Sequence, residues 1–350
     1  MTDTQRTRAP SMVDVAREAG VGLVTVSRVL NEPNVVRPET RLRVQEVIER
    51  LGYRRNDVAR ALKSGRSNTI GVVIAGSDPW ELPRTLKGVE QAADRAGYFV
   101  NLASFNGGSG ETLLAAVERL VNQAVEGIAV IADRPLIVDA LERMVSRVPI
   151  TVVMSGEITN PAIGSIELDQ DLGARMATEH LLQLGHRRIV HLTGRLDAFD
   201  ARVRLASWQR AMVAAGIPNP LYLEGDFSPA SGYRLTKEAM ALADRPTALF
   251  VGNDHMAMGA LAALAHLGIA VPGEVSVVGF DDIWGSDHLI PPLTTVRQDF
   301  TALGRTSVEL LIGMMGSAPV SHHLLPPTLI VRDSSGPAPG LNAKQSGGRS

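Results

Sequence analysis

The sequence predicts an α/β protein in which a small all-α headpiece precedes a two-lobed core built on parallel sheets. Residues 11–55 repeat apolar side chains at helical spacing, whereas residues 68–333 alternate short apolar runs with amphipathic helical patterns. The short runs are continuously apolar, which is typical of parallel strands covered by helices on both faces. The second segment is longer than one sheet ordinarily needs, so it suits two lobes.

The bulk composition is that of an ordinary globular protein and excludes several classes of function. Of the 350 residues, 45% are hydrophobic and 21% are charged, and there is no cysteine. The lack of cysteine excludes disulfide frameworks, zinc sites with thiolate ligands and thiol catalysis, and it is typical of a reducing compartment. We find no signal peptide and no apolar run of membrane-spanning length, so we expect a cytoplasmic protein.

The overall charge of −2 hides an asymmetry along the chain. Residues 1–66 carry 13 basic and 8 acidic residues, a net charge of +5, and the remainder is therefore acidic at −7. A basic module attached to an acidic body favours contact between the first segment and a polyanion. Charge alone also fits a solvated basic surface.

The headpiece is expected to contain three helices, after ten polar residues that we expect to be disordered. Ser11 and Asp14 have the spacing of a capping box at the start of the first helix. A second helix begins at Leu23, after a turn that contains two glycines. In the third helix, Pro38 suits the first helical position and Gly52 ends the helix.

The stretch GVGLVTVSRVLN, residues 20–31, has the composition of a strand but the periodicity of a helix. At about 100° per residue, Val26, Val29 and Leu30 lie on one side, and Val24 and Arg28 lie on the other. A helix, a glycine turn and a second helix with such an outer face predict a helix-turn-helix that enters the major groove of DNA. The alternative is a plain three-helix bundle in which Val24 is merely exposed.

Residues 56–67 form a separate segment. Asn56 suits the cap of a very short helix, and a linker rich in glycine and serine follows it. We therefore expect a hinge helix and linker between the headpiece and the core.

The core should contain several buried strands separated by helices. Helices are expected over residues 83–96, 111–125, 171–184, 202–215, 231–243 and 255–267. Strands are expected at TIGVVIA, YFVNLAS, GIAVIA, PITVVM, RRIVHLTG, TALFVGND and EVSVVGFDD. Residues 334–350 have low complexity and are expected to be a disordered tail.

The chain resembles the LacI (lactose-repressor/galactose-repressor) family of bacterial transcription regulators. The resemblance rests on VDVAREAGVGLVTVSRVLN, TRLRVQEVIERLGYRRNDVARAL, LTTVRQDFTALGRTSVELL and LLPPTLIVR, which follow the order of the family's motifs. It covers nearly everything except the two termini and is strongest toward the lactose-repressor branch. It implies a helix-turn-helix headpiece and a core like that of periplasmic sugar-binding proteins.

The resemblance also implies which residues contact DNA. An arginine can bond a guanine edge or a phosphate, and apolar side chains can pack on thymine methyl groups. The base-reading residues would be Leu23, Val24 and Arg28, the phosphate contacts Thr25, Ser27 and Asn31, and the hinge-helix contacts Ala59 and Leu62.

Leu62 would be the apolar wedge that enters the minor groove and kinks the duplex. Unstacking a base step costs a few kcal/mol, which contacts on the bent DNA offset. Ordinary packing of Leu62 against the next domain is the alternative. Two further positions depart from the family, since Gly22 and Arg37 stand where a capping serine is common.

The core offers candidate ligand contacts near the carboxyl ends of its strands, where a cleft between the lobes is expected. Sugars need polar side chains for their hydroxyl groups and aromatic rings for their C–H faces. By resemblance, Arg202, Asn253 and Asp281 are the polar contacts, Phe227 is a stacking ring, and Phe300, Gln298 and Leu168 line the cleft. Trp80 and Asp133 are weaker candidates at variable positions. Asp254 and Asp282 are expected to be structural caps, and Trp208 a core residue.

Nothing in the sequence indicates catalysis, a cofactor or a metal. The eight histidines lack metal-binding spacing, and His322 and His323 are expected on a strand. No glycine-rich nucleotide fingerprint and no nucleophile-elbow motif occurs, which argues against a dinucleotide-dependent enzyme.

We therefore expect a homodimeric repressor that reads a palindromic operator in double-stranded DNA and has no membrane partner. We expect a small-molecule inducer, a sugar or glycoside, to release it from the operator. The alternatives are a periplasmic-type sugar-binding protein and a corepressor-dependent repressor or activator of the same family.

Overall fold

The computed structural model describes residues 10–54, 66–75, 81–105, 110–132, 135–153 and 158–340. They belong to two compact units that divide between Ser67 and Asn68. The expected hinge helix, with Ala59 and Leu62, and the candidate residues Trp80 and Asp133 lie outside the described residues. Within the described ranges, no helix is both long and apolar enough to cross a membrane.

The first unit is a bundle of three helices, α1 (Met12–Glu18), α2 (Leu23–Asn31) and α3 (Pro38–Leu51), with a short 3-10 helix, η1 (Pro33–Val35), before α3. The capping box at its start is confirmed, because Asp14 N donates to Ser11 Oγ and Ser11 N donates to Asp14 Oδ2. Pro38 occupies the first turn of α3, and Gly52 ends α3 with a φ of 62°. All three helices therefore begin or end where the sequence predicts.

The core of the first unit is formed by one apolar stripe from each helix. Val15 of α1, Val26 of α2 and Val44 of α3 are fully buried, and Val29 and Val47 extend the cluster. Burying a side chain of this size contributes about 1.5–3 kcal/mol. The helical periodicity of residues 20–31 is thus confirmed.

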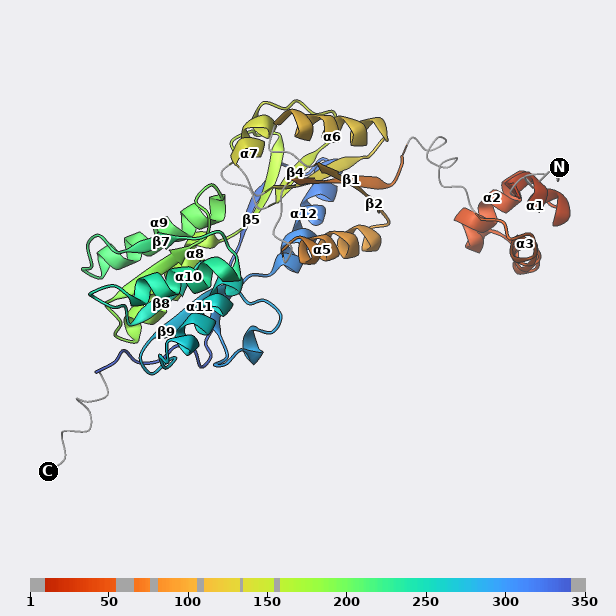
Figure 1. The fold of residues 1–350 in the computed structure, drawn as a ribbon. Coiled ribbons are helices and arrows are strands. Elements are labelled where there is room, and N and C mark those ends of the chain that lie inside the picture. The colour runs from red at the N-terminus through yellow and green to blue at the C-terminus, as the bar shows by residue number, and fades with distance from the viewer. Residues whose placement is uncertain are drawn as a thin grey trace, which may run out of the picture. The chain divides into compact units, whose positions relative to one another are not determined.

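The second unit consists of two lobes, each with a six-stranded sheet between two layers of helices (Figure 1). The sheet of the first lobe is wholly parallel, in the order β11-β5-β4-β3-β1-β2. Helices α6 and α7 cover one face of this sheet, and α5 and α12 cover the other (Figure 1). Its elements are β1 (Thr69–Ala75), β2 (Phe99–Phe105), β3 (Gly127–Ala132), β4 (Ile150–Val153), β5 (Ile163–Leu168), β11 (His322–Leu325), α5 (Glu81–Arg95), α6 (Gly110–Asn122), α7 (Pro135–Glu142) and α12 (Phe300–Met315).

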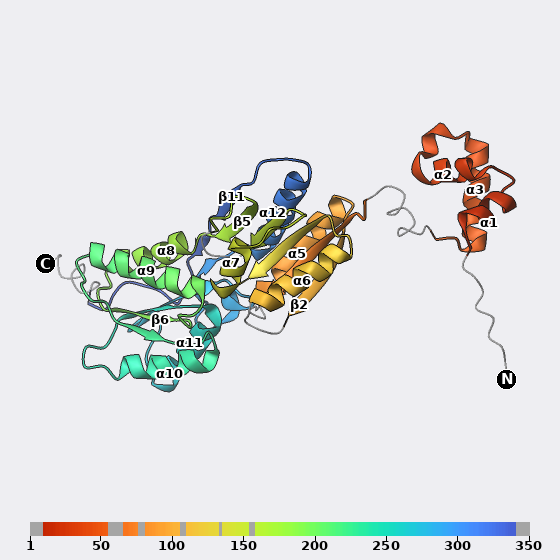
Figure 2. The same ribbon diagram turned by 90° about the horizontal axis from the view of Figure 1, so that it is seen from above.

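The sheet of the second lobe has the order β12-β10-β9-β8-β6-β7 and is parallel except for the edge strand β12. Helices α8 and α9 cover one face, and α10 and α11 cover the other (Figure 2). Its elements are β6 (Ile189–Thr193), β7 (Tyr222–Glu224), β8 (Ala248–Val251), β9 (Ser276–Asp281), β10 (Thr294–Arg297), β12 (Thr328–Ile330), α8 (Gln170–Gln183), α9 (Phe199–Ala214), α10 (Pro229–Met240), α11 (Asp254–His266) and the 3-10 helix η2 (Ser286–His288).

The predicted fold class is confirmed, and the sequence pattern missed mainly the short strands. All seven predicted strands are present, and His322 and His323 lie on β11 as expected. The strands β5, β7, β10 and β12 were not predicted. They are three to six residues long and include polar or edge positions, so they lack the continuous apolar run of a central strand.

The chain passes between the two lobes three times, and we call these passages the crossovers. They lie between β5 and α8, between β10 and α12, and between β11 and β12. A backbone hydrogen bond of 2.9 Å from Asp169 N to Leu325 O joins the first crossover to the third. The first two crossovers end in aspartate N-caps, Asp169 of α8 and Asp299 of α12, which set where each helix begins.

The expected disordered tail from residue 334 is corrected for residues 334–340, which pack on the second lobe. Ser334 is fully buried and its Oγ donates to Val277 O at 2.6 Å. His186 Nε2 lies 3.0 Å from Gly336 O, and Ala338 N donates to Leu184 O. Specific hydrogen bonds therefore order a segment whose low-complexity composition predicted disorder.

A histidine is buried in the core of the second lobe, where its protonation is costly. His191 on β6 is fully buried, stacks on Phe250 with ring centroids 4.3 Å apart, and lies beside Trp208. Its Nδ1 donates to Phe250 O at 2.9 Å. Burial lowers the pKa of His191 from 6.5 to about 3, although this hydrogen bond opposes the shift.

We therefore expect His191→Phe to remove part of the acid sensitivity of the second unit. Because the folded pKa lies below the unfolded one, the stability that neutral His191 contributes is present above pH 6.5 and is lost as the pH falls toward 3. Between pH 7.5 and pH 5, the free energy of unfolding should fall by about 2 kcal/mol more for the native chain than for the variant. Denaturant titrations at several pH values measure this difference, and parallel pH curves for the two proteins would contradict it.

Candidate nucleic-acid interface and effector site

The first candidate site is the outer surface of α2. The chain turns at Gly20, whose φ of 65° favours glycine, and α2 then begins after the N-cap Gly22. Gly22 provides no side-chain cap, so no capping side chain covers the amino end of α2, where a phosphate could bind. Arg37, the other position that departs from the family pattern, is the N-cap residue of α3 and likewise makes no side-chain capping bond.

Burial separates the residues of α2 into two faces. Val26 and Val29 are buried, whereas Leu23 and Val24 are 45% and 65% exposed. Arg28 is exposed one helical turn after Val24. An exposed apolar pair next to an exposed guanidinium provides contacts for thymine methyl groups and for a guanine edge or a phosphate.

The predicted phosphate contacts flank this face. Asn31 is exposed, and its Nδ2 donates to Ser27 O at 2.8 Å and lies 3.2 Å from Ser27 Oγ. Thr25 and Ser27 are half-buried, so their hydroxyl groups lie at the border of the buried face. The structure thus brings together the six predicted contacts of α2, while Ala59 and Leu62 lie outside the described residues.

The second candidate site lies at the carboxyl ends of β9 and β10 in the second lobe. Asp281 ends β9, and Gln298 follows β10 directly. Gln298 Nε2 donates to Asp281 Oδ1 at 2.7 Å, and both side chains are almost fully buried. Two of the predicted effector contacts therefore touch each other.

An arginine that the sequence analysis did not select completes this group. Arg204 on α9 is 2% exposed, and its Nη2 lies 3.8 Å from Asp281 Oδ1. Arg204 Nη1 donates to Gly252 O at 2.6 Å, and the guanidinium lies 3.9 Å from the ring centroid of Phe280. Burying a charge is costly unless it is paired and hydrogen-bonded, and this one is both.

The structure does not bring the predicted Arg202 into the group. Arg202 is exposed, and its Nη1 donates to Leu196 O at 3.4 Å. Arg204 could have been found from helical spacing, because it precedes the predicted core residue Trp208 by four positions and so lies on the same buried face of α9.

Asn253 and Phe227 lie next to one another beside this group. Asn253 is the N-cap of α11, since its Oδ1 accepts from Met256 N at 2.8 Å, and its Nδ2 donates to Phe227 O at 3.3 Å. Phe227 has a φ of 69°, and its ring lies so close to Gly194 that a Cβ there would come within 2.0 Å of it. Both residues therefore have structural roles in the described conformation.

The structure places the remaining predicted contacts elsewhere. Leu168 and Phe300 are 4% and 2% exposed and belong to an apolar cluster of the first lobe, between its sheet and the helices α5 and α12. The family resemblance predicted that both residues line the cleft, and each adjoins a crossover in the chain. In the described conformation both side chains belong to the apolar core of the first lobe and not to the polar group around Asp281.

The turn after Asp281 is held by a buried carboxylate. Asp281 and Asp282 have φ values of 107° and 53°, in a region that favours glycine, so the surrounding structure must stabilise them. Asp254 accepts hydrogen bonds at its two oxygens from Ile283 N (2.9 Å), Ser286 Oγ (2.7 Å) and Thr295 Oγ1 (2.6 Å). Burial raises the pKa of Asp254 to about 6, although these hydrogen bonds oppose the shift.

Asp282 contributes to the same turn through two ion pairs, with Arg297 at 2.6 Å and Arg332 at 2.7 Å. Asp254 and Asp282 are therefore structural, as expected, but they anchor a loop and do not cap a helix. Trp208 is fully buried, which confirms its predicted place in the core.

A cation of the first lobe acts on this acidic turn. Burial lowers the pKa of Arg84 on α5, and attraction by Asp282, Asp281 and Asp299 opposes the shift. The carboxylates at the carboxyl ends of β9 and β10 thus interact electrostatically with α5 of the other lobe.

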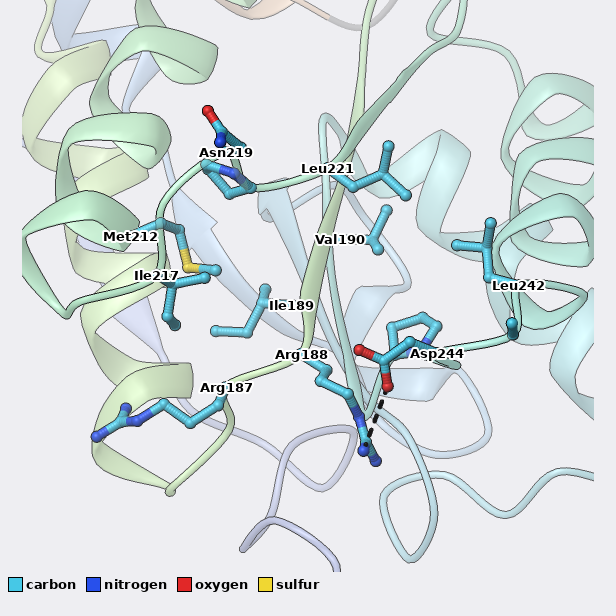
Figure 3. A pocket seen from close by; sticks show the side chains of 13 residues that line it. Arg187, Arg188, Ile189, Val190, Met212, Ile217, Asn219, Leu221, Leu242 and Asp244 are labelled. Carbon is cyan, nitrogen blue, oxygen red and sulfur yellow. Dashed lines mark ion pairs between the residues drawn. The ribbon is translucent and has the colours of Figure 1, made fainter.

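A hollow of about 430 Å³ lies at the opposite, amino ends of the strands in the second lobe (Figure 3). Its wall is apolar and includes Ile189, Met212 and Leu242. Its polar side chains do not converge, since Arg188 pairs with Asp244 at 3.5 Å and Arg187 points away (Figure 3). It is distinct from the group around Asp281, and we assign no ligand to it.

In the described part of the chain, no three His, Cys, Asp or Glu side chains are placed to hold a metal ion. The polar group around Asp281 contains an arginine, two amides and a carboxylate, which suits hydroxyl groups better than a cation.

Comparison with known protein families identifies both units. The family described as "Bacterial regulatory proteins, lacI family" matches residues 11–56, and a periplasmic binding protein-like domain matches residues 178–335. The chain is 35% identical to the lactose operon repressor of Escherichia coli (strain K12), over 93% of this chain and 90% of that protein. It is 33% identical to the ribose operon repressor of the same strain, over 91% of this chain and 94% of that protein.

Solved structures give the same result. The crystal structure of the Lac repressor dimer bound to operator and the anti-inducer ONPF has a TM-score of 0.85 and 34% identity, and the match covers 94% of this chain and all of that one. The complex of the transcriptional regulator CelR with cellobiose has a TM-score of 0.68 and 30% identity, covering 93% of this chain and all of that one. These relatives are transcriptional regulators and not enzymes, and the chain belongs to the lacI family of bacterial regulatory proteins.

Proposed function

We propose that the protein is a cytoplasmic, homodimeric transcriptional repressor that binds a palindromic operator and is released by a small-molecule inducer. The observation that carries the DNA-binding part is the outer face of α2, where Leu23, Val24 and Arg28 stay exposed while Val26 and Val29 hold the helix to the bundle. A two-fold dimer presents two such helices, which explains why the operator should be palindromic. The related Lac repressor is a dimer when bound to its operator.

The effector is proposed to be a carbohydrate or glycoside bound near Asp281, Gln298, Asn253 and Arg204. Carboxylate and amide oxygens accept from sugar hydroxyl groups, and the guanidinium and amide N–H groups donate to them. We expect the half-buried ring of Phe227, whose backbone oxygen accepts from Asn253 Nδ2, to cover an apolar sugar face. The related CelR was solved with cellobiose.

A periplasmic-type sugar-binding protein would share the two lobes but has no use for the helical headpiece. The exposed face of α2 therefore favours the repressor. A corepressor-dependent repressor or an activator of this family would have the same two sites. These alternatives are distinguished by whether the effector lowers or raises operator affinity, and by whether operator binding represses or activates transcription. Either response requires that the ligand bind two states with different affinity.

The test is to select DNA from a random pool with the full chain and then to screen sugars. We expect enrichment of a palindromic sequence, and the binding constant should fall by about 10³–10⁵ between 50 and 200 mM salt if six to ten phosphates are contacted. Calorimetry with cellobiose, with ONPG (the ligand of a solved Lac repressor structure) and with a panel of other sugars should identify a ligand that lowers operator affinity. If the protein enriches no DNA sequence above background, the proposal is contradicted. If the ligand raises operator affinity, the ligand is a corepressor and not an inducer.

A further inference from the structure

Four buried polar side chains, two of which are predicted effector contacts, form a ring of three hydrogen bonds and one ion pair. Arg204 Nε donates to Gln170 Oε1 at 2.8 Å, Gln170 Nε2 donates to Gln298 Oε1 at 2.7 Å, and Gln298 Nε2 donates to Asp281 Oδ1 at 2.7 Å. Arg204 Nη2 closes the ring as an ion pair, 3.8 Å from the same Asp281 oxygen, and it also lies 3.7 Å from Asp200 Oδ2. None of the four is more than 6% exposed, so water does not compete for these bonds.

The hydrogen bonds of the ring can run in only one direction. A guanidinium has no acceptor, so the Gln170 atom that faces Arg204 must be its oxygen. The Gln170 nitrogen then faces Gln298, whose oxygen must receive it, and the Gln298 nitrogen is left to donate to the carboxylate of Asp281. Arg204 and Asp281, the charged residues at the two ends of these three hydrogen bonds, therefore determine the orientation of both amides.

The ring also joins segments that connect the lobes. Gln170 begins α8 directly after the first crossover, and Gln298 lies in the second crossover, between β10 and α12. The bond between them is thus a side-chain link between two crossovers, next to the backbone bond from Asp169 to Leu325 that joins the first to the third.

We propose that Gln170 is a positioning residue, which turns the amide of Gln298 toward Asp281 and makes the effector site and the first two crossovers one hydrogen-bonded unit. This inference rests on the proposed function for its consequence. An effector hydroxyl that bonds to Asp281 or Gln298 competes with the hydrogen bonds of the ring. Effector binding therefore changes the hydrogen bonds that hold the first two crossovers, where the chain passes between the lobes. Gln170 itself needs no contact with the effector.

Two substitutions of Gln170 separate orientation from packing. Gln170→Glu keeps the shape and still accepts from Arg204, but it has no donor for Gln298. Gln298 then lies between two carboxylates, and its amide nitrogen cannot be replaced by its oxygen toward either one, so one of its two hydrogen bonds in the ring is lost and its orientation is no longer fixed. Gln170→His retains one acceptor and one donor on a neutral ring, so it can keep the direction of the ring and serves as the conservative rescue.

The measurement is hydrogen exchange of the full chain without DNA or effector, combined with NMR of the glutamine side-chain amides. In Gln170→Glu we expect exchange to rise about tenfold both at the second crossover (297–300) and at the turn 281–283, because one buried hydrogen bond is lost. The Gln298 side-chain signal should shift. In Gln170→His the exchange rates of both segments should stay within about twofold of those in the native chain, because the free energy of one such hydrogen bond varies by about 0.5 kcal/mol.

Gln298→Glu is the second variant, and it covers the case in which Gln170→Glu does not fold. It still accepts from Gln170 but cannot donate to Asp281, so exchange should rise more at 281–283 than at 297–300, whose bond to Gln170 is kept. An unchanged Gln298 signal in Gln170→Glu would overturn the proposal, and so would equal perturbation by Gln170→His. Because no DNA is present, these results are independent of whether the chain selects an operator.

Discussion

Arg28→Ala is expected to abolish operator selection while leaving the fold and effector binding intact. Arg28 is exposed on α2, so its removal should change the free energy of unfolding by less than about 0.5 kcal/mol. A bidentate arginine–guanine contact discriminates between bases by about 1–3 kcal/mol, and a dimer makes it twice. We therefore expect the preference for operator over random DNA to fall by about 100-fold or more.

Salt dependence distinguishes the two roles that Arg28 can have. If it reads a base, specificity relaxes at one position of each half-site and the salt slope is nearly preserved. If it contacts a phosphate, binding weakens on all sequences, and the slope falls by about one per arginine. Competition binding on operator variants at several salt concentrations measures both quantities.

Arg50→Ala is the matched control for Arg28→Ala. Arg50 is an exposed arginine in the last turn of α3, and it pairs with Glu18 of α1 at 3.0 Å. Its loss removes the same charge from the headpiece but leaves α2 unchanged, so operator preference should persist. An Arg28→Ala protein that still picks its operator out of competitor DNA would contradict the assignment of α2 as the recognition helix.

The headpiece could be predicted well because its determinants are local. Ser11, Asp14, Pro38 and Gly52 act within one turn of their own helix, and the burial of Val26 and Val29 follows from helical periodicity. The strand-like composition of residues 20–31 was outweighed because the bundle needs one apolar face and not two.

The effector site was predicted less completely because its determinants are long-range. Arg202 and Arg204 are two positions apart, so which one meets Asp281 depends on how α9 rotates against α8 and the sheet. That rotation is set by the burial of Trp208 and Met212. Leu168 and Phe300 adjoin crossovers, where a residue can face either the ligand or the core of the first lobe, and sequence position does not distinguish the two.

The anchoring of the turn at Asp281 could not be predicted either. Asp254 looks like an ordinary cap after a strand, yet Asn253 takes the cap, and Asp254 holds Ile283, Ser286 and Thr295. These partners are 29 to 41 residues away. Only the folded sheet brings them together.

Asp281→Asn is expected to remove the response to effector without affecting operator binding. The asparagine oxygen can still accept from Gln298, so the shape of the site is preserved. The charge opposite Arg204 is lost, and with it a charged acceptor for effector hydroxyl groups. Hydrogen bonds to charged groups contribute about 1.5–3 kcal/mol, so effector affinity should fall by about 10- to 150-fold.

Asp282→Asn separates this effect from loss of stability. Asp282 is adjacent in the chain, but it pairs with Arg297 and Arg332 and not with Arg204. Its substitution should therefore lower the melting temperature while the native effector affinity persists in the folded protein. Asp281→Asn takes a charge partner from the buried Arg204 and should also lower the melting temperature, but in the folded protein calorimetry should show weaker effector binding while operator titrations stay normal. A normal dose response in Asp281→Asn would place the effector away from β9, because no ligand bonded to that carboxylate can bind equally well once its charge is gone.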